Sequence, residues 1–124
     1  MLTLVNAERT SRGLAAFTSN GALTQAAESY AHTLLQFDSL THTANGTDPL
    51  GRMRAAGYTG GPTVGEVLWR GVGSWPPERT VADWMASPGH RAIILSSAYR
   101  EAGVGCAFKQ MGQLEARCVL DAAG

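Results

Sequence analysis

The sequence predicts an α+β fold from the order of its periodic segments. Helical patterns with recognisable capping residues occupy much of the chain up to Leu95, and two strand patterns joined by a short turn come last. No internal repeat, low-complexity tract or linker interrupts the 124 residues, so we expect one domain that spans residues 1–124. A chain of this length buries roughly 65% of its unfolded surface, which is enough for one core.

Three helices are predicted in the first half of the chain. Residues 2–12 follow a helical pattern, and Asn20 is placed to cap a second, longer helix. Asp48 as N-cap and Pro49 at the first helical position then open a short third helix. The apolar positions of the second helix recur at helical spacing and should face the core: Leu23, Ala26, Ala27, Tyr30, Ala31 and Leu34.

The middle of the chain is rich in loops and carries two polar candidates for a functional site. Residues 38–47 form a polar loop that contains His42, and residues 64–70 read as a short strand that contains Glu66. Trp69 lies near the glycines of this region, and partial burial is its default environment. The alternative for Trp69 is the wall of a ligand-binding groove, which its amphipathic ring would suit.

Two further helices are predicted before the terminal strands. Pro77 can start the first, and Ser87 followed by Pro88 can cap and start the second. Ser87 as a nucleophile with a histidine as base is the alternative, but no Gly-x-Ser-x-Gly elbow is present, so we expect a cap. Arg91 follows His90 and can either line the site, where it would pair with a ligand anion, or lie on a solvated helix face.

The two cysteines fall opposite each other in the predicted terminal hairpin. Residues 103–109 and 114–120 read as strands around a turn near Gly112, which pairs position 106 with position 118. A Cys106–Cys118 disulfide would close a short loop and would imply an oxidising compartment. Two buried free thiols are the alternative.

Charge and hydropathy bear on the partners of the protein. Ten basic and ten acidic residues give a net charge of zero, which favours neither nucleic acid nor an anionic membrane. No apolar run approaches the ~20 residues that a transmembrane segment needs. Met1 leads directly into a helical pattern, so we expect that an export signal has been removed and replaced by this methionine. A natural start at Met1 would instead indicate a cytoplasmic protein.

Seven motifs in a fixed order extend over nearly the whole chain. They are Asn6-Ala-Glu-Arg9 with Arg12-Gly-Leu14, Asn20-Gly-Ala-Leu23, His42, Arg54-Ala-Ala-Gly-Tyr58, Gly65-Glu66, Trp84-Met-Ala-Ser-Pro-Gly-His-Arg91 and Gly103-Val-Gly105. In this order they resemble the CAP superfamily, which comprises cysteine-rich secretory proteins, antigen 5, plant pathogenesis-related proteins and many bacterial relatives. The Ser-Pro-Gly-His form is typical of the SCP-like extracellular domains of bacterial members.

The resemblance implies a three-layer α-β-α sandwich with a central cleft. Carried over by position, the cleft histidines are His42 and His90, and its first acidic residue is Glu66. The position of the family's second acid holds Ser87, and Val67 follows Glu66 where asparagine is usual. Because of these two departures, the resemblance gives only weak support for transferring the activities of the eukaryotic members to this chain.

Two imidazoles and a carboxylate that converge on a cleft suit a divalent transition metal such as zinc. With His42 and His90 as the protein ligands, water would fill the other positions, as in open sites that are exchangeable or catalytic. Glu66 would orient a ligating ring or act as a general base on bound water. A purely structural network around Glu66 is the alternative, and it accounts for the same residues.

The resemblance leaves three functions open. The first is a secreted binding module whose partner is a small ligand, a lipid or an extracellular protein. The second is a metal-dependent, peptidase-like hydrolase that uses His42, Glu66 and His90. The third is a non-catalytic extracellular or cell-wall scaffold. The sequence does not decide whether the protein is an enzyme, because one fold supports many activities.

Overall fold

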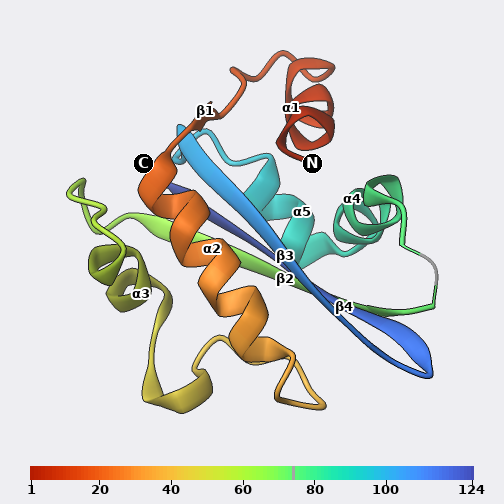
Figure 1. Ribbon diagram of the computed structural model, residues 1–124. Helices are drawn as coiled ribbons and strands as arrows, with labels where there is room; N and C mark the ends of the chain where they lie inside the picture. Colours follow the sequence, from red (N-terminus) through yellow and green to blue (C-terminus); the bar gives the residue numbers. More distant parts are fainter. Residues whose placement is uncertain (74) are drawn as a thin grey trace.

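A four-stranded sheet with helices on both faces forms the protein (Figure 1). This computed structural model describes residues 1–73 and 75–124, with the backbone alone for Met111. The elements in chain order are α1 (Leu2–Thr10), β1 (Thr18–Ser19), α2 (Gly21–Leu34), the 3-10 turn η1 (Ala44–Gly46), α3 (Pro49–Ala55), β2 (Val64–Val72), α4 (Pro77–Ala86), α5 (Pro88–Ile94), β3 (Glu101–Met111) and β4 (Gln113–Ala123).

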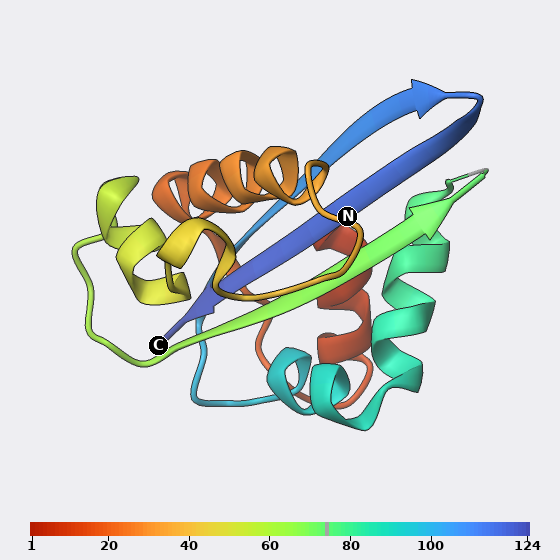
Figure 2. The ribbon, with the colours of Figure 1, turned by 90° about the horizontal axis from the view of Figure 1, so that it is seen from below.

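The helices divide into two layers. Helices α2 and α3 lie on one face of the sheet, and α1, α4 and α5 lie on the other (Figure 2). Each layer has its own apolar core against the sheet, one built around Trp84 and Ile94 and the other around Tyr30 and Leu34. The predicted α+β class and three-layer sandwich are confirmed.

The sheet has the strand order β1-β3-β4-β2, which leaves β2 at one edge. Strands β3 and β4 form the predicted hairpin, with Gly112 at a φ of +83° in the turn. Both strands extend beyond the predicted ranges, because cross-strand pairing continues to the Glu101–Ala123 pair. Strand β1 pairs in parallel with β3 and was not predicted. A strand of two residues is too short to show an alternating hydrophobic pattern.

The predicted N-caps of α2 and α3 are confirmed, and so is the predicted core face of α2. The Asn20 side chain accepts hydrogen bonds from the backbone N–H groups of Ala22 and Leu23, at 3.0 and 3.1 Å. Asp48 caps α3 by accepting from the N–H of Gly51 at 2.6 Å. The residues predicted for the core face of α2 are all buried: Leu23, Ala26, Ala27, Tyr30, Ala31 and Leu34.

Some predicted boundaries and core positions differ in detail. Helix α1 ends at Thr10, two residues before the predicted end, and its chain reverses through Gly13 at a φ of +79°. The helical patterns after Pro77 and Pro88 predict that Met85, Ile93 and Leu95 bury, but the three lie half-buried against the core of their layer. The helix pattern fixes the direction of these side chains, whereas their depth depends on the neighbouring layer.

The Gly103-Val-Gly105 motif has a packing role. Helix α2 lies directly on β3, and a Cβ atom at Gly103 would collide with the backbone of Thr24. A Cβ atom at Gly105 would collide in the same way with the backbone of Glu28. Glycine at these positions therefore lets the helix backbone approach the strand.

Arg9 joins α1 to the end of α5. Its guanidinium group is buried and donates to the carbonyl oxygens of Ala15, Ile94 and Ser96, at 2.8, 2.7 and 2.9 Å. The same group lies 3.9 Å from the ring centroid of Phe17. Arg9 belongs to the Asn6-Ala-Glu-Arg9 motif. Because its buried side chain satisfies carbonyl groups at and after the end of a helix, Arg9 has a structural role in this motif.

The predicted disulfide is present. Cys106 and Cys118 are cross-strand partners in the β3–β4 hairpin, and their sulfur atoms are bonded. The alternative of two free thiols is therefore wrong. A disulfide in a small domain is typical of an oxidising compartment.

Removal of this disulfide should measurably destabilise the domain. The bond joins residues 12 positions apart, so the chain-entropy account predicts a loss of about 3 kcal/mol in the free energy of unfolding for a Cys106→Ala/Cys118→Ala double variant. Urea denaturation would measure the loss, and reduction of the wild type should reproduce it. Equal stabilities of the oxidised wild type and the double variant would contradict this prediction.

Candidate functional site

Glu66 is the centre of a polar network below the cleft. It lies on the edge strand β2, is 4% exposed, and receives two hydrogen bonds from Arg52 Nη2, at 2.7 Å to Oε1 and 2.8 Å to Oε2. His42 Nδ1 lies 2.8 Å from Glu66 Oε1. Both carboxylate oxygens are thus held by charged or polar donors.

Arg52 connects Glu66 to the loop that carries His42. Helix α3, opened by the Asp48 cap, presents Arg52 toward the sheet. Its Nη1 donates to the carbonyl oxygen of His42 and to the hydroxyl of Thr47, both at 2.8 Å. One guanidinium group therefore fixes the acid and the backbone of the histidine at the same time.

Tyr30 supports this arrangement from α2. The guanidinium carbon of Arg52 lies 3.4 Å from the centroid of the Tyr30 ring, which is a cation–π contact. The Tyr30 hydroxyl donates to the carbonyl oxygen of Thr41 and accepts from the backbone N–H of Ala44 at 3.1 Å. The loop around His42 is therefore tied to the helix layer on both sides of the histidine.

The protonation of Glu66 determines the state of His42. Burial tends to raise the pKa of Glu66, but His42, Asp121 and Arg52 outweigh that effect and hold the pKa below its usual value. Because the carboxylate is ionised, His42 must present its Nδ1–H to Glu66. The Nε2 atom of His42 is then left for a ligand, and the side chain is 49% exposed.

Asp121 is a second buried acid directly behind Glu66. The two residues are cross-strand partners in β2 and β4, and Asp121 is fully buried. No described donor lies within hydrogen-bonding geometry of its carboxyl oxygens, whereas a protonated Asp121 can itself donate to the Glu66 carboxylate. Burial and then the neighbouring Glu66 carboxylate raise the pKa of Asp121 to about 10. Asp121 is therefore a neutral carboxylic acid at physiological pH.

His90 approaches the same region from α5. It is half-buried, and burial followed by the charge of His42 lowers the pKa of His90 below its usual value. Neutral His90 has a lone pair available for a metal ion or a hydrogen bond.

Two hollows follow one another along β2. The first, of ≈ 560 Å³, is lined by His42, Glu66 and Leu50, and the second, of ≈ 280 Å³, by His90 and Trp69. Consecutive segments of the edge strand form the floor of both. The structure thus brings the three predicted site residues to neighbouring parts of one strand edge.

The remaining predicted site residues lie around the second hollow or outside it. Ser87 is the N-cap residue of α5 and lines the hollow, but its side chain makes no capping hydrogen bond and, in the described residues, none with a histidine. Trp69 is 5% exposed and donates its indole N–H to Asp83 at 2.8 Å. Arg91 is exposed on α5 and does not line the hollow of His90.

The donor set limits what metal ion the site can hold. Across residues 1–73 and 75–124, no group of three or more histidine, cysteine or acidic side chains is arranged to bind a metal. Glu66 is engaged by Arg52 and His42, which leaves His42 and His90 as donors. Because His42 lines the first hollow and His90 the second, an ion shared by both would have to lie between the hollows, with water completing its coordination.

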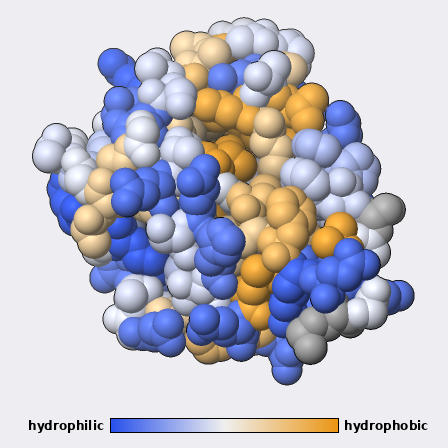
Figure 3. Space-filling view, in the orientation of Figure 1, coloured by the Kyte–Doolittle hydropathy of each residue, from blue (hydrophilic) through white to orange (hydrophobic). Residues whose placement is uncertain are grey.

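A separate apolar hollow of ≈ 340 Å³ lies between the starts of α1 and α4. Met1, Leu2, Trp75 and Val104 contribute to its lining. The space-filling view shows an apolar area between α1 and the sheet on this side of the molecule (Figure 3). A lipid ligand would have to use such a surface, and lipid binding stays a prediction.

Arg52, Tyr30 and Asp121 are the site residues that sequence reasoning missed. Asp121 had a visible signal, since it is an isolated acid within the otherwise apolar run from Cys118 to Ala123. Arg52 follows the predicted Asp48 cap but looks like an ordinary surface arginine. Its role emerges only when α3 and β2 are placed side by side.

The fold and site define an α-β-α sandwich protein in which His42 contacts the buried Glu66 and His90 lines the neighbouring hollow. The chain belongs to the cysteine-rich secretory protein family, CAP, whose sequence model matches residues 2–119. No curated protein sequence matches the chain significantly. In the described residues, no helix combines the length and apolar character that crossing a bilayer requires.

Solved structures of surface and extracellular proteins have the same fold. An outer surface protein of Borrelia burgdorferi is similar at a TM-score of 0.80 and 22% identity, over 98% of this chain and 88% of that one. An SCP-domain extracellular protein of Bacillus anthracis gives a TM-score of 0.70 and 18% identity, over 96% of this chain and 38% of that one. A cysteine-rich secretory protein of Staphylococcus aureus gives 0.61 and 21%, over 96% and 36%.

Proposed function

We propose that this protein is an extracellular binding module that presents His42 and His90 to a ligand, with Glu66 as the buried anchor of the cleft. One observation carries the proposal: both carboxylate oxygens of Glu66 are engaged, by Arg52 and by His42. An acid held in this way orients an imidazole.

The state of Glu66 argues against the hydrolase alternative. A general base works best when its pKa lies near the working pH, and the surroundings of Glu66 lower its pKa instead. Its side chain is 1% exposed, so a water molecule would have to displace Arg52 or His42 to reach it. Binding makes use of this arrangement as it stands, whereas base catalysis would require it to open.

The two imidazoles are suited to an exchangeable divalent ion. His42 offers Nε2 while Glu66 holds Nδ1, which is the second-sphere arrangement that raises the basicity of a ligating histidine. A bound Zn²⁺ would supply an electrophilic coordination position for an oxygen atom of the ligand. We include zinc in the proposal as the ion that best matches neutral imidazole.

The extracellular part of the proposal rests on two supports. The Cys106–Cys118 disulfide is a bond that persists in oxidising compartments. Structures with the same fold come from an outer surface protein and an extracellular protein. Secretion of the natural protein would be tested by detecting it outside the cells of its source.

Zinc titration of the whole chain tests the proposed site. By calorimetry at pH 7.5, we expect binding that is abolished in His42→Ala and in His90→Ala and is lost on acidification as imidazole protonates. His32→Ala is the matched control, because the third histidine is exposed on α2 away from the cleft. Glu66→Gln should weaken binding by about 10–100-fold. Absence of binding in the wild type would remove the metal ion from the proposal.

A second assay separates binding from catalysis. The wild type should be silent against a library of peptide and ester substrates, with and without zinc. Turnover that disappears in Glu66→Gln would establish the hydrolase alternative and overturn the binding proposal. Circular dichroism of each variant would ensure that a lost signal reflects the site and not an unfolded chain.

A further inference from the structure

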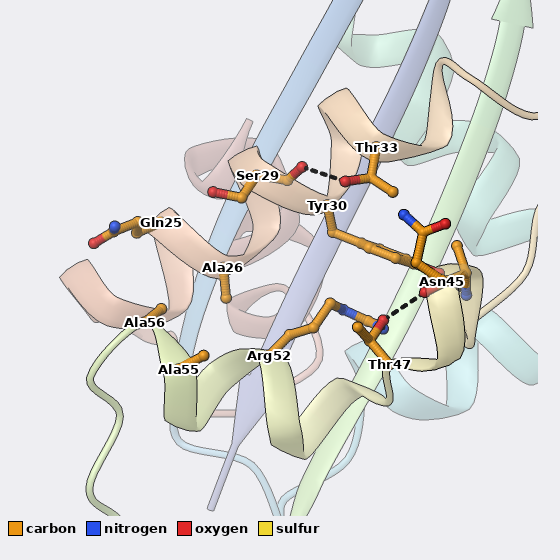
Figure 4. A pocket seen from close by; sticks show the side chains of 11 residues that line it. Gln25, Ala26, Ser29, Tyr30, Thr33, Asn45, Thr47, Arg52, Ala55 and Ala56 are labelled. Atoms are coloured by element: carbon orange, nitrogen blue, oxygen red, sulfur yellow. Dashed lines mark hydrogen bonds between the residues drawn. The ribbon is translucent and has the colours of Figure 1, made fainter.

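A cavity of ≈ 250 Å³ opens between α2 and α3, with Arg52 in its lining but not Glu66 (Figure 4). One wall comes from α2, another from residues 44–47 and the third from α3. The volume is just below the roughly 300–1,000 Å³ of sites for drug-sized ligands, so the cavity suits a single substituted ring.

The rim of this cavity carries polar side chains without protein partners. Gln25 and Ser29 lie on α2, and Asn45 lies in η1. Within the described residues, their side-chain amide and hydroxyl groups make no hydrogen bond with the rest of the chain. Each of these groups can both donate and accept, so the rim can satisfy a ligand that carries several hydroxyl groups.

The floor combines small apolar groups with a neutralised arginine. Ala26, Ala55 and Ala56 contribute methyl groups. Arg52 crosses between α3 and Tyr30, is 10% exposed, and has a buried Nε–H without an acceptor (Figure 4). Its charge is balanced by Glu66, so the cavity has no excess charge with which to attract an ion.

We propose that this cavity is a binding site for a neutral sugar ring. A pyranose presents hydroxyl groups around its edge and C–H groups on its faces, which match the polar rim and the alanine floor. An ionised ligand finds no unbalanced charge, and an apolar ligand would gain no hydrogen bond from the exposed rim groups. The site is separate from the histidine cleft, so its occupancy does not depend on a metal ion there.

Chemical-shift titration of the ¹⁵N-labelled whole chain tests the proposal. The probes are N-acetyl-D-glucosamine and methyl α-D-glucopyranoside, with phosphate and decanoate as charged and apolar comparisons. We expect saturable shifts from the sugars at residues 25–33 and 44–56, with a dissociation constant on the order of a millimolar. Phosphate and decanoate should leave these amides unchanged.

A pair of matched variants locates the binding. Ala55→Leu places a larger side chain at an exposed helix position that lines the cavity, and it should weaken sugar binding at least tenfold. Ala92→Leu makes the same change at an exposed alanine of α5 and should leave binding unchanged. Absence of saturable shifts with both sugars would overturn the proposal. Equal binding by Ala55→Leu, or a stronger response to phosphate or decanoate, would overturn it as well.

Two further measurements separate related outcomes. Tighter binding of N,N′-diacetylchitobiose than of the monosaccharide would identify the end of a glycan chain as the ligand, and weaker binding would identify a free sugar. Either result upholds the site. His90→Ala should retain sugar binding while it loses zinc, so failure of the metal proposal and failure of the sugar proposal give different results.

Discussion

Arg52→Met is expected to lower the free energy of unfolding by about 3–5 kcal/mol, because it leaves the Glu66 carboxylate buried without its bidentate partner. Methionine keeps much of the apolar stem, so the loss reports the missing charge and its hydrogen bonds. Urea denaturation monitored by circular dichroism would measure it. Arg91→Met is the matched control: Arg91 is exposed on α5, and its replacement should change stability by less than about 0.5 kcal/mol.

The double variant Arg52→Met/Glu66→Gln separates the ion pair from general packing. If the unpaired carboxylate causes the loss, neutralising Glu66 should restore part of it, with a coupling of about 1–3 kcal/mol between the two sites. Simple addition of the two single losses would show that Arg52 acts through packing alone. Glu66 would then not be an energetic anchor of the site.

Asp121→Asn is expected to stabilise the protein at alkaline pH. The folded-state pKa of Asp121 is about 10, against a usual value of 3.8, so the folded chain keeps a proton that the unfolded chain releases. Between these two values the unfolded state binds fewer protons, and the wild type therefore loses stability as the pH rises. Asparagine removes this dependence. The gain should be near zero at pH 4 and should grow by up to about 1.4 kcal/mol per pH unit above it, which amounts to several kcal/mol at pH 8.

Denaturation at several pH values would test this expectation. Asp38→Asn serves as the control, because Asp38 is exposed in the loop after α2. Its effect should stay below about 0.5 kcal/mol at every pH. A constant or negative effect of Asp121→Asn across the range would mean that Asp121 is ionised in the folded protein. The statement that Asp121 is a neutral acid in the folded protein would then be wrong.

The parts of the fold that were predictable from sequence depend on local signals. Asn20 and Asp48 cap their helices through backbone groups two or three residues away, and the spacing of the α2 core face is set by the helix itself. The Cys106–Cys118 pairing follows from the position of a single turn. In each case the deciding interaction lies within one element or one hairpin.

The unpredicted parts depend on contacts between distant elements. Arg52 acquires its role because α3 packs beside β2, and Asp121 faces Glu66 because β4 pairs with β2 in one particular register. No local pattern specifies either placement. Trp69 illustrates the same point, since partial burial was its expected environment and the packing of α4 against β2 leaves it 5% exposed.

The candidate site was predicted through its family resemblance and not through spacing. His42, Glu66 and His90 are far apart in the sequence, and the fold brings them to neighbouring positions along β2. The resemblance pointed to neither Arg52 nor Asp121, which together with His42 hold the pKa of Glu66 below its usual value. Those two residues decide whether Glu66 acts as an anchor or as a base.

The tautomer of His42 reports whether Glu66 anchors the imidazole ring. A two-bond ¹H–¹⁵N correlation spectrum of the imidazole groups at pH 8 reports which ring nitrogen carries the proton. If Glu66 anchors the ring, His42 will show a protonated Nδ1 and a bare Nε2, with an Nε2 signal that shifts when zinc is added. A protonated Nε2, or the averaged pattern of a freely exchanging ring, would show that Glu66 does not anchor His42.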